Sequence, residues 1–173
     1  WGRNLTEHTG EAEFMETVER ALYNGALSGL SLDGKHYFYD NPLESRGTHA
    51  RSEWFSCACC PPNIARTIAQ ISRYATSFSN DGFWIHIPIG MEANCQINGE
   101  PVKITINSNY PWDGNVEVKF ELNKPTRFKL HIRIPEWCED TNLDSKAEEG
   151  ESDYDKGYIV IDKVWNPNET VSF

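Results

Sequence analysis

The feature that most restricts the fold is a change in hydrophobic pattern near residue 81. Beyond that point, apolar and polar residues alternate in short segments, which is the period-two pattern of strands with one buried face. The clearest segments are residues 83–87, 102–106, 116–122, 128–134 and 158–161. Turn-forming pairs such as Asn98-Gly99 and Asp113-Gly114 separate them at short intervals. The pattern predicts an antiparallel β-sandwich over residues 81–173.

Two parts of this region have a different character. Residues 139–155 are acidic and polar, and we expect them to form an exposed loop with little packing. Residues 171–173 look like the middle of a strand, and the chain opens on Trp1. We therefore expect the sequence to be a piece of a longer protein.

Residues 1–80 show helical periodicity instead. Phe14, Val18 and Leu22 recur at helical spacing and predict a helix over residues 9–28, with Thr9 or Gly10 as its N-cap. A second apolar series predicts a helix that starts at Pro61-Pro62 and runs to about residue 78. Between them, an Asp-Gly pair predicts a β-hairpin over residues 30–39, followed by a loop over residues 44–52. The chain thus divides into a helical part, residues 1–80, and an all-β part, residues 81–173.

The charge balance excludes several classes of partner. The formal net charge is −10, whereas nucleic acids and anionic membrane surfaces attract proteins with a positive field. No stretch approaches the roughly 18 consecutive apolar residues of a membrane-spanning helix. A neutral, carbohydrate-like ligand is compatible with this composition, as is a homodimer.

Three of the five cysteines crowd into four positions just before the second predicted helix: Cys57, Cys59 and Cys60. An odd, clustered set differs from the spread framework of a disulfide-stapled secreted domain, so it favours reduced thiols and a cytoplasmic location. The start of a helix stabilises thiolate, and thiolate is a good zinc ligand. Zinc takes about four donors, and this cluster offers at most three. The alternative is that the cysteines pack as small apolar side chains.

Six short segments carry a family resemblance. They are ERALYNG (19–25), SLDG (31–34), YDNPLES (39–45), CCPPN (59–63), YPWDG (110–114) and RIPEW (133–137). In this order and combination, the chain resembles glycoside hydrolase family 127, the β-L-arabinofuranosidase family. The matches extend over most of the chain.

The resemblance implies an α+β chain that contains the end of an (α/α)6 barrel, with two helices and a hairpin, followed by a β-sandwich. It also implies a zinc-dependent retaining glycosidase that releases L-arabinofuranose from plant-type glycans or glycoproteins. Cys59 would be the nucleophile and a zinc ligand, and Cys60 a second ligand, whereas Cys57 receives no role. Glu19 and Tyr39 match sugar-contacting positions.

The resemblance also indicates what this segment lacks. The family's other zinc ligands, a Glu and a Cys two residues apart, and its acid/base Glu have no counterpart here. We do not expect Glu44 or Glu53 to replace them. Because retaining hydrolysis needs both a nucleophile and an acid, the segment alone is predicted to be inactive.

Several alternatives stay open at this point. Glu19 could be a solvated helix charge, and Tyr39 a strand aromatic packed in a core. Trp84, Trp112, Trp137 and Trp165 are expected to fill cores rather than to form a sugar-stacking surface. At the level of function, the alternatives are a non-catalytic carbohydrate-binding sandwich with a structural thiolate zinc site, and a purely structural zinc domain.

Overall fold

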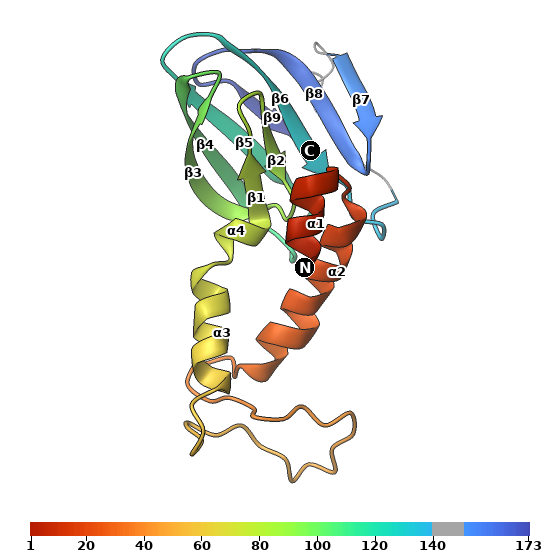
Figure 1. The fold of residues 1–173 in the computed structure, drawn as a ribbon, viewed down its shortest axis with the longest axis vertical. Coiled ribbons are helices and arrows are strands. Elements are labelled where there is room, and N and C mark those ends of the chain that lie inside the picture. The colour runs from red at the N-terminus through yellow and green to blue at the C-terminus, as the bar shows by residue number, and fades with distance from the viewer. Residues whose placement is uncertain (140–150) are drawn as a thin grey trace. The chain divides into compact units, whose positions relative to one another are not determined.

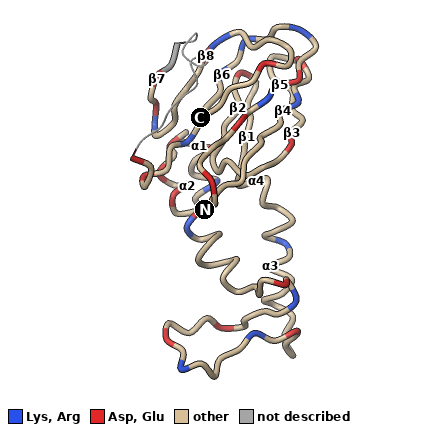
Figure 2. The backbone as a smooth tube through the Cα atoms, turned by 180° about the vertical axis from the view of Figure 1, so that it is seen from behind, with Lys and Arg blue, Asp and Glu red and all other residues tan. Residues whose placement is uncertain are grey.

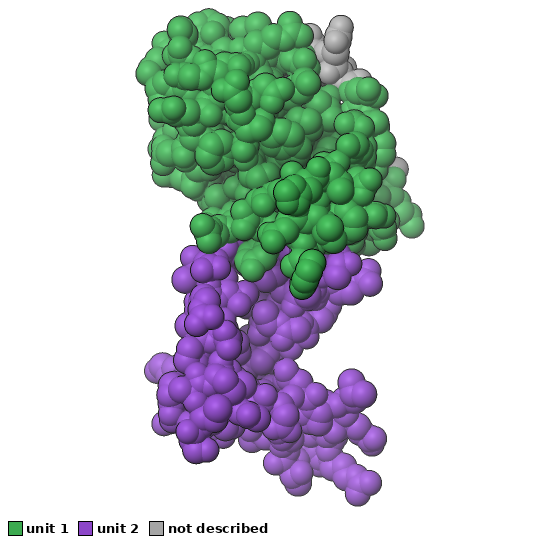
Figure 3. Space-filling view, viewed as in Figure 1, with its two compact units in different colours: residues 1–16, 72–173 green, residues 17–71 purple. Residues whose placement is uncertain are grey.

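The computed structural model describes residues 1–139 and 151–173. The chain separates into two compact units, shown in Figure 3. The sandwich unit comprises residues 1–16 and 72–173, and the helix-loop unit comprises residues 17–71. The predicted boundary between residues 1–80 and 81–173 stays a prediction.

Two sheets form the body of the sandwich unit (Figure 1). The five-stranded sheet has the order β1-β2-β6-β8-β7, and the four-stranded sheet has the order β3-β4-β5-β9. The strands are β1 (Thr76–Phe78), β2 (Gly82–Ile85), β3 (Ile89–Ile97), β4 (Glu100–Asn109), β5 (Val116–Leu122), β6 (Thr126–Arg133), β7 (Glu151–Asp155), β8 (Tyr158–Trp165) and β9 (Thr170–Ser172). The mixed helix and β-sandwich fold is as predicted. One pairing departs from the antiparallel pattern, because β2 runs parallel to β6.

Alternation along the strands produces the core. In β5, Val116 and Val118 are buried while Glu117 between them is exposed. Phe120, Phe128 and Trp165 form an aromatic cluster between the sheets, with ring centroids 4.4–5.6 Å apart. The Trp165 indole N–H donates to the Phe128 carbonyl at 3.0 Å, so this buried ring leaves no polar atom unpaired.

The expectation that four tryptophans fill the core is correct for only part of the set. Trp165 is 0 % exposed, and half-buried Trp84 stacks on His131 with ring centroids 4.1 Å apart. Trp112 and Trp137, however, are 85 % and 64 % exposed. Both lie in connections beyond the ends of strands, where the alternating pattern no longer places a side chain inside.

The predicted loop at residues 139–155 is wrong at its C-terminal end. Residues 140–150 lie outside the described residues, but β7 pairs with β8 along its whole length. Its sequence, ESDYD, has low strand propensity, and pairing with the edge of an existing sheet overrides that preference. The pattern also misses β3, whose inward positions include the small residues Ala93 and Cys95.

The first predicted helix begins too early. The structure has α1 (Gly2–Thr9) and α2 (Glu13–Ala21), with a break at the predicted N-cap. Gly10 instead ends α1, with φ 74°, and its N–H donates to the Thr6 carbonyl at 2.8 Å. Glycine suits such a left-handed C-terminal position. After α2 the chain continues through a π-helical turn, Leu22–Ala26, and a 3-10 turn, Leu27–Gly29.

The second predicted helix is too long. α3 (Cys60–Ala69) ends at Gln70, and a short α4 (Ser72–Ala75) precedes β1. Residues 76–78 pair with β2 because Thr76, Ser77 and Phe78 lie opposite Ile85, Trp84 and Phe83. Sheet pairing therefore replaces the last helical turn.

The predicted hairpin at residues 30–39 forms a turn without strands. Tyr37 makes isolated bridges to Leu30 and to Ser52, the second from within the predicted loop. The turn is closed by the Ser31 N–H, which donates to the His36 carbonyl at 2.9 Å.

Within the described residues, no helix is both long enough and apolar enough to cross a membrane. Figure 2 shows acidic and basic residues interspersed along the described part of the chain.

Candidate thiol site

The three clustered cysteines lie where α3 begins, as predicted. Cys59 is the N-cap, Cys60 is the first helical residue, and Pro61 and Pro62 occupy the first turn. Proline is tolerated there because its missing N–H would have no helical partner. The Asn63 side-chain amide donates to the Cys59 carbonyl at 2.7 Å, which fixes the backbone that carries both thiols.

The sulfur atoms converge on Cys59. Its Sγ lies 3.4 Å from the Sγ of Cys57 and 3.4 Å from the Sγ of Cys60. All three are free thiols; Cys57 and Cys59 are exposed, and Cys60 is half-buried. Interpretation of the cluster as small apolar core residues is therefore wrong for Cys57 and Cys59.

Tyr39 completes this group from the preceding loop. The Cys60 thiol lies 3.6 Å from the Tyr39 carbonyl oxygen. Hydrogen bonds from Cys60, Cys57 and Tyr39 lower the pKa of the Cys59 thiol, in that order of importance. The same hydrogen bond to Cys59 raises the pKa of Cys60, and one from the Tyr39 hydroxyl raises the pKa of that phenol. These contacts therefore favour ionisation of Cys59 over that of Cys60 and Tyr39.

The loop that carries Tyr39 is held by contacts within the helix-loop unit. The Arg51 guanidinium donates to the Ser28 carbonyl at 2.7 Å and lies 4.2 Å from the centroid of the Phe38 ring. Phe38 in turn stacks on His49, whose Nε2 lies 2.9 Å from the Asp40 carbonyl oxygen. These contacts flank Tyr39 on both sides in sequence and give it a defined position.

Neither of the two predicted sugar-contacting residues has the environment that its alternative interpretation requires. Tyr39 is 51 % exposed, and its ring leans on Phe55 at 5.6 Å, so it is not a core aromatic. Glu19 lies on α2 and is 6 % exposed, so it is not a solvated helix charge. Tyr23 lies one helical turn after Glu19. Burial raises the pKa of Tyr23, and the Glu19 charge raises it further. The structure brings Tyr39 together with the cysteines and leaves Glu19 on the preceding helix.

Sequence reasoning missed two residues beside this group. Asn63, bonded to the Cys59 carbonyl, ends the CCPPN segment, so its position in the segment could have revealed it. Phe55, which supports the Tyr39 ring, belongs to none of the resembling segments, and no pattern in the sequence points to it.

The donor types at this site fit zinc in part. Two thiolates bound to one tetrahedral zinc at about 2.3 Å would lie about 3.8 Å apart. The Cys59 and Cys60 sulfurs, at 3.4 Å, are close to that spacing. Among the described residues, no group of three or more His, Cys, Asp and Glu side chains is arranged to hold a metal ion. The pair thus fits as two of the four donors.

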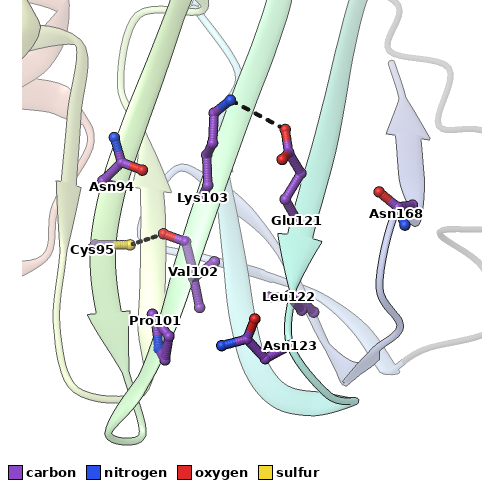
Figure 4. Close-up of a pocket in the computed structure, with 9 residues that line it drawn as sticks. All are labelled: Asn94, Cys95, Pro101, Val102, Lys103, Glu121, Leu122, Asn123 and Asn168. Atoms are coloured by element: carbon purple, nitrogen blue, oxygen red, sulfur yellow. Dashed lines mark hydrogen bonds and ion pairs between the residues drawn. The ribbon is translucent and has the colours of Figure 1, made fainter.

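A cavity of about 430 Å³ in the sandwich unit provides a contrast (Figure 4). Lys103 lies at its wall between Glu92 and Glu121, with N–O distances of 3.2 and 3.3 Å. Its one thiol, Cys95, is buried and points toward the Val102 carbonyl at 3.7 Å. Burial raises the pKa of Cys95 to about 11, so this thiol stays protonated. The cavity contains none of the predicted site residues.

Comparison with known families agrees with the sequence resemblance. The sequence model described as the GH127 β-L-arabinofuranosidase catalytic domain matches residues 1–73. The model of the GH127 middle domain matches residues 82–173, more than half of the chain. The chain belongs to glycoside hydrolase family 127.

Individual relatives agree with this assignment. A non-reducing end β-L-arabinofuranosidase from Bifidobacterium longum subsp. longum is 36 % identical over 143 residues, which cover 73 % of this chain and 21 % of the relative. The crystal structure of a GH127 β-L-arabinofuranosidase from Geobacillus stearothermophilus T6 has a TM-score of 0.86 and 36 % identity, covering 99 % of this chain and 29 % of that one. A GH127 β-arabinofuranosidase structure has a TM-score of 0.85 and 29 % identity, covering 99 % and 30 %. The chain therefore spans less than a third of the length of these relatives.

Proposed function

We propose that this chain is part of a zinc-dependent retaining glycoside hydrolase that releases L-arabinofuranose from plant-type glycans or glycoproteins, with Cys59 as the nucleophile. Membership of family 127 supports the glycosidase assignment. The single observation that supports the role of Cys59 is the convergence of two thiols and the Tyr39 hydroxyl on its sulfur.

The chemistry assigned to Cys59 proceeds in two displacements. Its thiolate attacks the anomeric carbon, and a C–S bond forms as the bond to the leaving oxygen breaks. The leaving oxygen takes a proton from a carboxylic acid outside this chain. The carboxylate left by that step takes a proton from water as the water oxygen attacks the same carbon from the side opposite Cys59. The C–S bond breaks, and the thiolate and the carboxylic acid are restored with net retention.

Cys59 and Cys60 would hold zinc together with donors outside this chain. Bound zinc would supply positive charge that keeps a coordinated thiol ionised near neutral pH. Cys60 is the first residue of α3, so its bond to zinc would hold the neighbouring Cys59 thiol in a fixed orientation. Tyr39, half exposed beside the sulfur, is suited to contact the sugar as it reaches Cys59. For Glu19 we propose that its carboxylate accepts a hydrogen bond from a sugar hydroxyl.

Hydrolysis of an aryl β-L-arabinofuranoside tests this proposal. We expect the full-length protein that contains this chain to hydrolyse it and the 173-residue segment to be inactive, since the acid lies elsewhere. Cys59→Ser should lower kcat at least 10³-fold, because a serine hydroxyl is rarely ionised and attacks poorly. Cys57→Ser, the same change two residues away, should keep most of the activity. Turnover by Cys59→Ser at the wild-type rate would overturn the role of Cys59, and turnover by the segment would overturn its inactivity.

Removal of zinc tests the metal separately. Treatment with a chelator should abolish hydrolysis by the full-length protein, and added Zn²⁺ should restore it. Cys60→Ser should lower the bound zinc, measured by elemental analysis, well below one equivalent, because a neutral hydroxyl replaces a thiolate donor. Full activity in the metal-free protein would contradict zinc dependence.

The second candidate function is a non-catalytic carbohydrate-binding sandwich with a structural thiolate zinc site. The exposure of Trp112 and Trp137 on the sandwich unit favours it. Alkylation separates the two candidates. If blocking Cys59 in the full-length protein abolishes turnover, the enzyme is supported, whereas a fully coordinated thiol that resists iodoacetamide supports the structural site.

A further inference from the structure

We infer that Tyr110, Trp112 and Trp137 form a second glycan-binding surface, carried by the sandwich unit. We call these three residues the aromatic platform. Taking a glycan as its ligand rests on the proposed function. The platform would bind sugar units of a longer substrate, apart from the residue that is cleaved.

The platform combines two connections that are distant in sequence. Tyr110 and Trp112 follow β4, and Trp137 follows β6. The Tyr110 and Trp137 rings stack with centroids 6.2 Å apart and an angle of 22° between their planes. Trp112 belongs to the same short turn as Tyr110, because its N–H donates to the Asn109 carbonyl at 2.9 Å.

The exposure of these rings distinguishes them from packing residues. A single exposed apolar side chain is common on a protein surface and needs no explanation. Here two tryptophans, 85 % and 64 % exposed, lie in connections joined by a ring stack. Tryptophan buries about 150–250 Å² when it is covered, so leaving two exposed forgoes substantial stabilisation that a ligand can recover.

Hydrogen bonds hold the platform in place before a ligand binds. The Tyr110 N–H donates to the Ser108 hydroxyl at 3.0 Å, and the Asp113 carboxylate accepts from the Asn115 N–H at 2.9 Å. In the turn that carries Trp137, the Cys138 N–H donates to the Pro135 carbonyl at 2.9 Å. Rings presented on fixed turns lose little conformational freedom on binding, which favours affinity.

The charges carried by the two connections favour a neutral, hydroxyl-rich ligand. Residues 108–115 and 134–139 contain Asp113, Glu136 and Glu139 but no Lys or Arg. Their carboxylates can accept hydrogen bonds from sugar hydroxyls and would repel phosphate and acidic chains. The faces of aromatic rings carry partial negative charge and attract the weakly positive C–H bonds on one face of a sugar ring. An oligosaccharide satisfies both requirements.

The test compares two ligands in the full-length protein carrying Cys59→Ala, which prevents their consumption. The ligands are an L-arabinofuranosyl tetrasaccharide and the methyl glycoside of one L-arabinofuranose unit, and their Kd values are measured by calorimetry. Trp112→Ala and Trp137→Ala should each weaken tetrasaccharide binding about tenfold, the effect of losing one good stacking contact, and leave monosaccharide binding within twofold. Trp112→Phe, which keeps an aromatic ring, should retain part of the affinity.

Phe78→Ala is the matched control, because Phe78 is 57 % exposed on β1 of the same unit. It should change neither Kd. Unchanged tetrasaccharide binding in both tryptophan variants would overturn the inference. So would conversion of a wild-type dimer to a monomer without loss of sugar affinity, which would identify the platform as a protein interface.

Hydrolysis of an aryl arabinofuranoside by the wild-type protein, measured in parallel, separates this inference from the proposed function. If hydrolysis occurs and the tryptophan variants bind normally, the platform fails while the enzyme assignment stands. If the variants lose tetrasaccharide binding but the wild-type protein does not hydrolyse the glycoside, the platform stands as a binding site and the glycosidase assignment fails.

Discussion

The Arg133 guanidinium is paired with the Glu16 carboxylate inside the sandwich unit. The Arg133 side chain is 0 % exposed and that of Glu16 is 12 % exposed. Arg133 also donates through Nε to the His86 carbonyl at 2.5 Å, and the His86 ring lies 2.8 Å from the Tyr158 hydroxyl. Residues 1–16 are therefore fixed to the sandwich by a buried polar network, although the catalytic-domain family model covers them.

Removing one partner of this pair should strongly destabilise the fold. Glu16→Gln removes the carboxylate that pairs with the buried Arg133 guanidinium, which should cost about 3 kcal/mol in the free energy of unfolding. The control is Glu7→Gln, whose partner Arg3 lies one turn away and whose pair is about a third exposed. That change should cost about 0.5 kcal/mol or less. Equal losses for the two variants in urea unfolding would contradict the role of burial.

The stability of the sandwich unit should fall as the pH falls below 6.5. Burial and then the Arg133 charge lower the pKa of His86 to about 3, while burial and then Lys129 lower the pKa of His131 to about 4. Above pH 6.5 both histidines are neutral in both states. Between about pH 6.5 and the folded pKa values, the unfolded chain takes up protons that the folded chain does not. Each histidine then removes about 1.4 kcal/mol per pH unit.

His131→Phe tests this pH dependence. The His131 ring stacks on Trp84, and its buried Nε2 has no hydrogen-bond partner among residues 1–139 and 151–173, so phenylalanine keeps the shape and removes the titrating group. We expect a shallower fall in unfolding free energy between pH 6.5 and 4.5 than in the wild-type protein. An unchanged slope would show that His131 does not contribute.

The outcome for the fold follows from how local each signal is. The strands with large apolar residues on one face, such as β4 and β5, can be predicted because the alternating pattern and the burial coincide. β7 could not be predicted, because it forms a strand through its pairing with β8 and not through the strand propensity of its own residues. The sequence alone does not place the break at Gly10, because glycine occurs at both ends of helices, and the hydrogen bond from its N–H to the Thr6 carbonyl shows that it ends α1.

The outcome for the candidate site follows the same rule. The cysteines and their place at a helix start could be predicted, because the CCPPN segment contains both the thiols and the helix-starting prolines. The approach of Tyr39 to Cys59 could not be derived from spacing, since it depends on how a loop of about twenty residues folds back. Only the family resemblance identifies Tyr39. The contact between the Arg51 guanidinium and the Phe38 ring, which helps to position this loop, cannot be inferred from the sequence.

Alkylation should distinguish the cysteines by environment. With the metal removed, iodoacetamide should modify exposed Cys57 and Cys59 much faster than Cys95, which is 9 % exposed and whose pKa is raised to about 11. Thiolate is the reacting form, so burial and a raised pKa both slow Cys95. Peptide mapping by mass spectrometry after a short pulse measures each site. Modification of Cys95 as fast as Cys59 would contradict the described burial.

Gly157 should tolerate alanine worse than a glycine of the same conformation in open space. Gly157 has φ +86°, and a Cβ there would lie 2.7 Å from the Ala12 Cβ. Gly99, in the turn between β3 and β4, has φ +76°, and no atom of the described residues lies within 4 Å of its Cβ position. Gly99→Ala should cost about 1 kcal/mol for the left-handed backbone alone, and Gly157→Ala about 2–3 kcal/mol because Ala12 must also move. Ala12 is tied to this turn by its N–H, which donates to the Lys156 carbonyl at 2.8 Å, so little relief is available. Urea unfolding of both variants measures the difference, and equal costs would show that the Ala12 contact yields freely.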